Sequence, residues 1–135
     1  GIEYERGSGR LRLGSEILFA SGEAELSSGG QQVLAEVASA LCDANPASVR
    51  IEGHTDSDPV SKTSVRWKRG NWDLSATRAL EVLVFLRDEG RVPESMLNVA
   101  GYGPYRPVAS NDTVEGKRRN RRVEIFVEGA VDRAQ

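Results

Sequence analysis

The chain has 135 residues, 39% of them hydrophobic and 28% charged, a balance typical of one soluble globular domain and unlike that of a disordered chain. No run approaches the roughly 18 apolar residues that a membrane span needs, so no part of this sequence is expected to cross a bilayer. The net charge of −2 hides an asymmetry, because residues 1–60 carry −6 and residues 61–135 carry +4.

The N-terminal segment predicts a lead-in followed by a strand. Residues 1–10 are rich in glycine and charge, and we expect them to form a flexible lead-in. The chain starts at Gly1 without a methionine or a signal peptide, so we expect a piece of a longer protein. In the segment RLRLGSEILF the apolar residues alternate as in a strand that Gly14 interrupts. These apolar residues are Leu11, Leu13, Ile17 and Phe19.

The segment SSGGQQVLAEVASALCDANP predicts a helix. Ser28 and Gln31 resemble a capping box, and Pro46 lies beyond the expected end. The apolar residues at helical spacing are Val33, Leu34, Val37, Ala38 and Leu41. Cys42 lies on this apolar side and is expected to be a small core residue. Since it is the single cysteine, it excludes an internal disulfide.

The second half of the chain predicts further strands and one more helix. A strand over residues 49–53 leads into a long polar loop, about 57–72. The segment LSATRALEVLVFLRDEG predicts a helix, with Asp73 or Ser75 as its cap and Gly90 just past its end. Its expected apolar side is Ala76, Ala79, Leu80, Leu83 and Leu86. MLNVAGYG and RRVEIFVEG predict two more strands, and strands alternating with helices favour an α/β two-layer sandwich.

Catalytic, metal and phosphate sites are weakly supported. His54, the only histidine, and Cys42 lie far apart and give no zinc-ligand spacing. His54 and Asp56 lack a nucleophile motif such as G-x-S-x-G, so we expect no catalysis and no cofactor, and a histidine that bonds its own loop. The stretch GYGPYRP is not followed by a helix, so Gly101 and Gly103 are expected to serve a turn.

The basic residues raise the possibility of an anionic partner. Half of the 18 lie in two runs: Lys62, Arg66, Lys68 and Arg69, and then Lys117, Arg118, Arg119, Arg121 and Arg122. Such runs are typical of solvated faces, and they also occur where a protein meets an anion. The pI of about 5.5 and the absence of a DNA- or RNA-reading motif argue against nucleic acid.

A carboxylate and a guanidinium remain as the candidate binding pair. Ligands of helix-covered sheets often lie outside the carboxyl ends of strands, where Asp56 is expected. Arg78 is expected near the start of the second helix, close to free backbone N–H groups. Asp56 would hold an ammonium while Arg78 grips a carboxylate, which suits an amino-acid-like zwitterion. The alternative is that Asp56 and Arg78 simply pair with each other.

Several motifs in order resemble a known family. ILFASGEAEL, IEGHTD, NWDLSATRA and GYGPYRPVASNDTVEGKRRNRRVEI follow one another as in the OmpA-like domain, a peptidoglycan-binding module of outer-membrane proteins, lipoproteins and motor stators. The resemblance covers roughly residues 13–128. It implies a βαβαβ-type fold with a mixed four-stranded sheet and helices on one face. The expected organisation is a lead-in over 1–10, the domain over 11–129 and a tail over 130–135.

The resemblance also implies a function and a site. It implies non-catalytic binding of the peptide stem of peptidoglycan, in which Asp56 and Arg78 hold the diaminopimelate residue. Asn71 matches a loop asparagine of the family, and Thr55 lies where backbone contacts to the ligand are expected. In the NRRV motif, strand alternation aims Arg121 and Arg122 at opposite faces, so at most one reaches the ligand; we retain Arg122 as a candidate.

The long loop after Asp56 indicates a subfamily. The D-x-x-P-V opening and the NWDLS entry look like MotB-type stator subunits of flagellar motors. This resemblance implies a periplasmic domain that forms a homodimer, and a full-length protein anchored in the inner membrane beside an ion-channel partner. The alternatives are an outer-membrane protein or lipoprotein of the same family, and an anchoring or protein-interaction module of another ion-driven complex.

Overall fold

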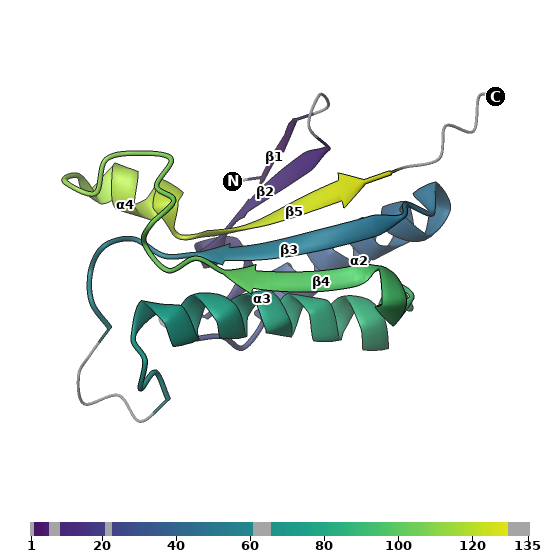
Figure 1. The fold of residues 1–135 in the computed structure, drawn as a ribbon, viewed down its shortest axis with the longest axis horizontal. Helices are drawn as coiled ribbons and strands as arrows, with labels where there is room; N and C mark the ends of the chain where they lie inside the picture. Colours follow the sequence, from purple (N-terminus) through teal and green to yellow (C-terminus); the bar gives the residue numbers. More distant parts are fainter. Residues whose placement is uncertain (1, 6–8, 21–22, 61–65, 130–135) are drawn as a thin grey trace.

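The computed structural model describes residues 2–5, 9–20, 23–60 and 66–129. A five-stranded mixed sheet runs through it in the order β1-β2-β5-β3-β4 (Figure 1). β3 and β4 are parallel, and the other neighbouring strands are antiparallel. The strands are β1 (Ile2–Glu5), β2 (Arg10–Gly14), β3 (Ser48–His54), β4 (Leu97–Gly101) and β5 (Arg122–Glu128). The helices are α1 (Ser15–Leu18), α2 (Ser28–Ala44), α3 (Asn71–Asp88), the 3-10 turn η1 (Glu94–Met96) and α4 (Val114–Asn120).

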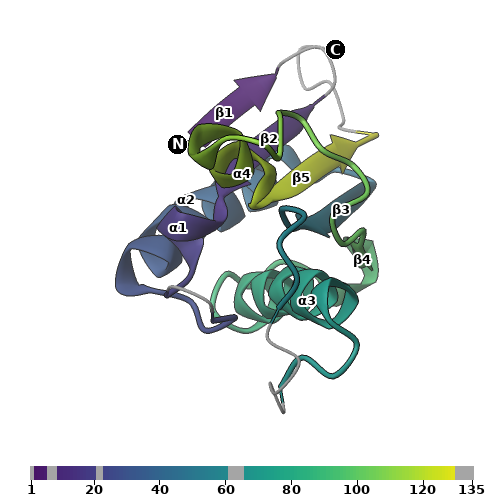
Figure 2. The same ribbon diagram turned by 90° about the vertical axis from the view of Figure 1, so that its left-hand side faces the viewer.

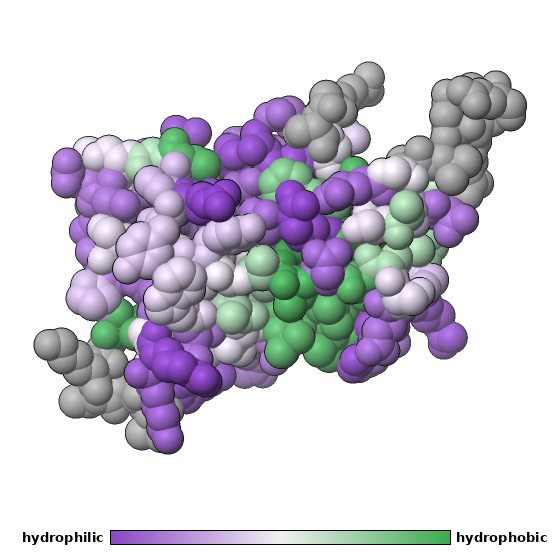
Figure 3. Space-filling model, in the orientation of Figure 1, coloured by the Kyte–Doolittle hydropathy of each residue, from purple (hydrophilic) through white to green (hydrophobic). Residues whose placement is uncertain are grey.

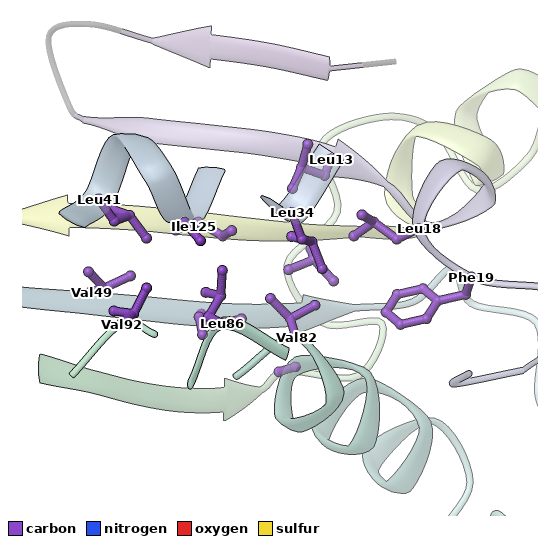
Figure 4. Packing of buried hydrophobic residues seen from close by; sticks show 14 residues of the cluster. Leu13, Leu18, Phe19, Leu34, Leu41, Val49, Val82, Leu86, Val92 and Ile125 are labelled. Atoms are coloured by element: carbon purple, nitrogen blue, oxygen red, sulfur yellow. The ribbon is translucent and has the colours of Figure 1, made fainter. Parts of the chain in front are cut away.

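The helices α1, α2 and α3 lie on the same side of the sheet, which confirms the α/β sandwich (Figure 2). The core fills the space between the helices and the sheet, where side chains of α2 and α3 meet those of the strands (Figure 4). The fully buried members include Leu13, Leu34, Val49, Ile51, Val82, Leu86, Val123 and Ile125. Alternate residues of β5 therefore face the helices, as the period of two in a strand requires.

The sheet has one strand more than the four expected. The extra strand, β1, comes from the segment that was expected to be a lead-in, and it pairs antiparallel with β2. Oppositely charged residues face each other across this pair, with Arg10 2.5 Å from Glu5 and Arg12 3.7 Å from Glu3. The charged residues that predicted a flexible segment therefore form ion pairs between the edge strand β1 and its neighbour β2. The expected tail, residues 130–135, lies outside the described residues.

Two further elements differ from the sequence prediction. Ile17 does not continue a strand, because residues after Gly14 turn into α1, and Phe19 forms an isolated bridge to Leu26. α4 occupies a stretch that was expected to be a loop, and Thr113 caps it by accepting a bond from the Gly116 N–H at 2.9 Å. Both helices are short, so neither shows a repeated apolar period.

The two long helices were predicted with errors at their starts. Ser27, one residue before the expected cap, accepts from the Gly30 N–H and begins α2. α3 begins at Asn71, three residues earlier than expected, after Gly70 at a positive φ of 65°. The expected apolar side of α3 is confirmed at Ala79, Leu83 and Leu86, which lie in the core or pack against it. It is wrong at Leu80, which is 48% exposed, and it omitted the fully buried Val82.

Exposed residues correct one expectation and mark one surface. Cys42 is exposed, not a core residue. An apolar patch lies over α3 and β4, where Leu80 and Val99 are the exposed large hydrophobic residues (Figure 3). Within the described residues, no helix combines the length and the apolar character required to cross a bilayer.

Candidate functional site

The candidate site lies at the carboxyl end of the parallel pair β3–β4. The chain leaving β3 is tied to the chain leaving β4, because the Thr55 N–H donates to the Gly103 carbonyl at 3.0 Å and the Tyr102 N–H to the Gly53 carbonyl at 3.0 Å. Asp56 follows directly. In this arrangement the two strand ends meet beside α3, the usual position of a ligand site in a helix-covered sheet.

Asp56 is a buried carboxylate with two fixed contacts. One oxygen, Oδ2, lies 2.6 Å from Nη1 of Arg121, and the other, Oδ1, accepts from the Asp58 N–H at 3.0 Å. The Arg121 side chain is 38% exposed, so the ion pair opens toward solvent. Asp56 therefore does not pair with Arg78, which excludes the simple alternative from the sequence.

Arg78 is a buried cation beside this pair. Its Nε donates to the Glu23 carbonyl at 2.8 Å, and its guanidinium lies 5.0 Å from the centre of the Phe19 ring. Its Nη1 and Nη2 donate to no group among the described residues. Because α3 begins at Asn71, Arg78 lies beyond the first helical turn, contrary to the expectation that free backbone N–H groups surround it.

The charges of Arg78, Arg121 and Asp56 act on one another. Burial, and after it the positive charge of Arg121, lower the pKa of Arg78 to about 10, while Asp56 and Glu23 oppose the shift. Arg78 still carries its proton at neutral pH. The site thus presents two guanidinium groups and one carboxylate, an arrangement that accepts a ligand with both anionic and cationic groups.

Thr55 and Asn71 support the loop that carries Asp56. The Thr55 hydroxyl donates to the Asp56 carbonyl at 2.8 Å. Asn71, the first residue of α3, donates from Nδ2 to the Asp58 carbonyl at 3.1 Å. Thr55 therefore contacts Asp56 directly, and Asn71 is linked to it through Asp58, while a ligand contact by Thr55 or Asn71 stays a prediction.

Arg122 lies away from the Asp56 carboxylate. It is buried, its Nε donates to Glu124, and its Nη1 and Nη2 donate to the carbonyls of Asn120 and Arg106 at 2.9 and 2.7 Å. Arg121 is the member of the pair that contacts Asp56. The sequence carried a signal for this choice, because Arg121 shares strand parity with the buried Val123 and Ile125, which face the helices.

His54 belongs to a buried charged cluster on the sheet. Its Nε2 lies 3.2 Å from Oε1 of Glu52, and its ring stacks on Tyr102 at 5.2 Å between centroids. The expectation that it bonds its own loop is therefore wrong. Burial lowers the pKa of His54, and the charge of Arg122 adds to this, while Glu124 and Glu52 oppose it. Among the described residues, no group of three or more His, Cys, Asp or Glu is placed to hold a metal ion.

Parts of the basic runs are paired within the chain. Arg66 forms an ion pair with Glu23, Arg69 lies 2.9 Å from Asp73, and Lys117 lies 3.1 Å from Asp58. Lys62 lies outside the described residues. These surface ion pairs contribute little to stability, and they reduce the positive charge that the two basic runs offer to an anionic partner.

Comparisons with known proteins agree with the motifs. Residues 18–121 match the model of the OmpA family. The chain is 32% identical over 117 residues to "Motility protein B" of Bacillus subtilis, which covers 87% of this chain and 44% of that protein. It is 36% identical over 115 residues to "Probable lipoprotein YiaD" of Escherichia coli, covering 85% and 49%. The chain thus spans less than half the length of these relatives.

A solved structure agrees with the fold. The cell wall anchor of the T6SS from Pseudomonas aeruginosa superposes with a TM-score of 0.86 and 32% identity, covering 95% of this chain and 87% of that one. The two folds therefore agree over nearly the whole length of both chains.

Proposed function

The chain belongs to the OmpA family, and from this premise we propose that it binds peptidoglycan without catalysis, by holding the diaminopimelate residue of the stem peptide. The free centre of diaminopimelate carries an ammonium and a carboxylate. Asp56, whose partner Arg121 is partly exposed, accepts the ammonium, and the Nη groups of Arg78 donate to the carboxylate. The observation that carries the proposal is this grouping of Asp56, Arg78 and Arg121 at the end of β3.

The expected affinity of one site is modest. A hydrogen bond to a charged group contributes about 1.5–3 kcal/mol, and ordering the ligand costs part of two such contacts. One stem peptide is therefore held with a Kd of roughly micromolar to millimolar. Firm attachment to the wall follows from many copies that engage the polymer together.

The likeness to a motility protein supports a more specific role within the cell envelope. We place the chain in the periplasm, as the wall-anchoring part of a stator of an ion-driven motor, whose full-length protein is anchored in the inner membrane beside a channel partner. The likeness to a T6SS wall anchor supports another envelope complex as the alternative. The likeness to a probable lipoprotein supports a lipoprotein of the same family as a further alternative.

We also propose that the chain forms a homodimer. The edge strand β4 carries no charged residue, and the apolar patch of Leu80 and Val99 lies beside it. The opposite edge, β1, carries Glu3 and Glu5. Since charge on an edge prevents strand addition, a second copy is expected to add at β4 through a two-fold axis.

Sedimentation with purified sacculi tests the wall-binding proposal. We expect the wild-type chain to sediment, and Asp56→Asn and Arg78→Gln to stay largely in the supernatant. The matched controls are Asp88→Asn and Arg87→Gln, which change the same charges on the exposed end of α3 and are expected to sediment as wild type. Equal sedimentation of Asp56→Asn, Arg78→Gln and wild type contradicts the site. Release of soluble wall fragments contradicts the non-catalytic part.

A further inference from the structure

A hollow beside the Asp56 loop is not used by the stem-peptide clamp. It has a volume of about 300 Å³ and lies between the chain after β3, the start of α3 and the turn after β4. Its lining is rich in rings and has polar groups at its rim: Trp67, Trp72, Pro104 and Tyr105, with Lys68 and Asn71. The combination of flat apolar walls and a few polar groups is typical of small-ligand sites.

Two aromatic residues present open faces in this hollow. The rings of Trp72 and Tyr105 lie 5.3 Å apart between centroids and are tilted by 32°. Trp72 is 51% exposed and Tyr105 is 68% exposed. Gly103, at a φ of +59°, lies against both rings, since a side chain there would begin 3.7 Å from each. The turn after β4 therefore holds two large rings together while leaving their outer faces to solvent.

The hollow is connected to the Asp56 carboxylate by direct hydrogen bonds. Asn71, which lines the hollow, donates to the Asp58 carbonyl at 3.1 Å, and the Asp58 N–H donates to Asp56 Oδ1 at 3.0 Å. The hollow therefore adjoins the loop that carries Asp56. In peptidoglycan, the units next to diaminopimelate are two residues of stem peptide, which extend at most about 3.5 Å each, and then the sugar.

We propose that this hollow is a subsite for a sugar ring of the glycan strand, next to the stem peptide held at Asp56 and Arg78. The proposal rests on the proposed function. A pyranose has one face of C–H groups and a rim of hydroxyl and acetamido groups. The C–H face packs on Trp72 and Tyr105, and the polar rim reaches Asn71 and Lys68. A peptide residue without a ring offers no such flat face, which is why a sugar fits this lining better.

Calorimetric titration with two ligands tests the subsite. One ligand is the free stem tripeptide with diaminopimelate, and the other is the same tripeptide on its disaccharide. We expect the wild-type chain to bind the disaccharide-peptide roughly fivefold or more tightly than the peptide alone. Tyr105→Leu and Trp72→Leu are expected to abolish this gain and to leave the affinity for the free peptide unchanged.

Two controls isolate the role of the ring faces. Tyr105→Phe keeps the ring and is expected to keep the gain. Tyr4→Leu removes an aromatic residue of similar exposure, 63%, on the remote edge strand β1, and is also expected to keep it. Thermal melts of each variant show that the fold is intact, and Tyr105, the more exposed ring, is the decisive position.

The outcomes separate the subsite from the clamp. If wild type binds both ligands equally, the subsite is wrong and stem-peptide binding stands. If the gain persists in both leucine variants, the sugar binds elsewhere and the subsite is wrong. If neither ligand binds, the stem-peptide function fails, and the subsite fails with it.

Discussion

Arg121 and Arg122 follow each other in the chain but contact different groups. Arg121 reaches the Asp56 carboxylate and stays partly exposed, whereas Arg122 is buried among Glu124 and two carbonyl oxygens. Although burial acts to raise it, the pKa of Glu124 is lowered by the hydrogen bond and the charge of Arg122. Arg122 thus neutralises a buried carboxylate on the sheet, and Arg121 belongs to the charged group around Asp56.

Glutamine substitutions separate these two roles. Arg122→Gln leaves the buried Glu124 without its main partner and is expected to lower the free energy of unfolding by about 3 kcal/mol or more. Arg121→Gln removes a half-exposed pair and is expected to lower it by less than about 1 kcal/mol. Urea denaturation measures both. A larger loss in Arg121→Gln than in Arg122→Gln contradicts the assignment.

His54 predicts a pH dependence of stability. It is the only histidine, and histidine is the side chain whose ordinary pKa lies near pH 6.5. Its pKa in the folded chain is lowered from 6.5, so the unfolded chain binds the proton more tightly. Stability therefore falls as the pH drops through 6.5 toward the lowered pKa, by at most about 1.4 kcal/mol per pH unit.

Unfolding of wild type and His54→Gln between pH 8 and pH 5 measures this dependence. Wild type is expected to lose stability across that range, and His54→Gln is expected to show a much flatter profile. Parallel profiles for the two proteins contradict the buried, neutral state of His54.

At the scale of residues, the sequence predicted two of the three charged residues at the end of β3, but not the groups that they and His54 contact. Asp56 and Arg78 were predicted, and the structure brings them into one charged group with Arg121. Arg122 was retained instead of Arg121, although Arg121 shares strand parity with Val123 and Ile125, which face the helices. The partner of His54 was missed because Glu52 and His54 face each other only when β3 is extended to its last residue.

At the scale of elements, the site depends on how closely α3 approaches the sheet. A side chain at Gly53 would begin 2.0 Å from the Ser75 carbonyl oxygen, and one at Gly101 would begin 2.6 Å from the Ala76 backbone nitrogen. α3 thus rests directly on the backbones of β3 and β4. This close contact places Arg78 near Asp56.

Alanine at Gly53 is expected to push α3 away from β3. The expected result is a loss of about 2 kcal/mol or more in the free energy of unfolding, together with weaker binding of the stem peptide. The matched control is Gly29→Ala in α2, where the new methyl would meet only the Ser27 hydroxyl oxygen at 4.0 Å.

Gly29→Ala is expected to be neutral or to stabilise by about 0.5–1 kcal/mol, since alanine favours the helix. Thermal melts and peptide titration of both variants provide the comparison. Unchanged binding and stability in Gly53→Ala contradict the close packing.

Long elements were predicted from the sequence and short ones were not. α2, α3 and the three strands β3, β4 and β5 have repeated patterns, and the sequence located each of them. α1 has four residues and α4 seven, too few for a period. β1 was missed because an edge strand with charges on it has the composition of a flexible segment.

At the scale of the whole molecule, the two edges of the sheet differ in charge. The β1 edge is charged, and the β4 edge with its neighbouring apolar patch is not. Val99→Lys places a charge at the centre of β4, where a two-fold axis would bring two copies of the lysine together.

Val99→Lys is therefore expected to reduce dimerisation and to leave binding of a single stem peptide unchanged. Tyr4→Lys on β1 is the control and is expected to keep the wild-type mass. Analytical ultracentrifugation at several concentrations gives the mass of each protein. A Val99→Lys protein as dimeric as wild type excludes β4 as the interface.

In the proposed function, Asp56 and Arg78 recognise the two charges of one diaminopimelate centre. A calorimetric titration compares stem peptides with diaminopimelate or with lysine, which keeps the ammonium and lacks the carboxylate. Wild type is expected to prefer diaminopimelate by roughly tenfold or more, and Arg78→Gln is expected to lose that preference. Asp56→Asn is expected to weaken both ligands. Equal affinity of wild type for the two peptides, or a preference that survives in Arg78→Gln, would contradict the account.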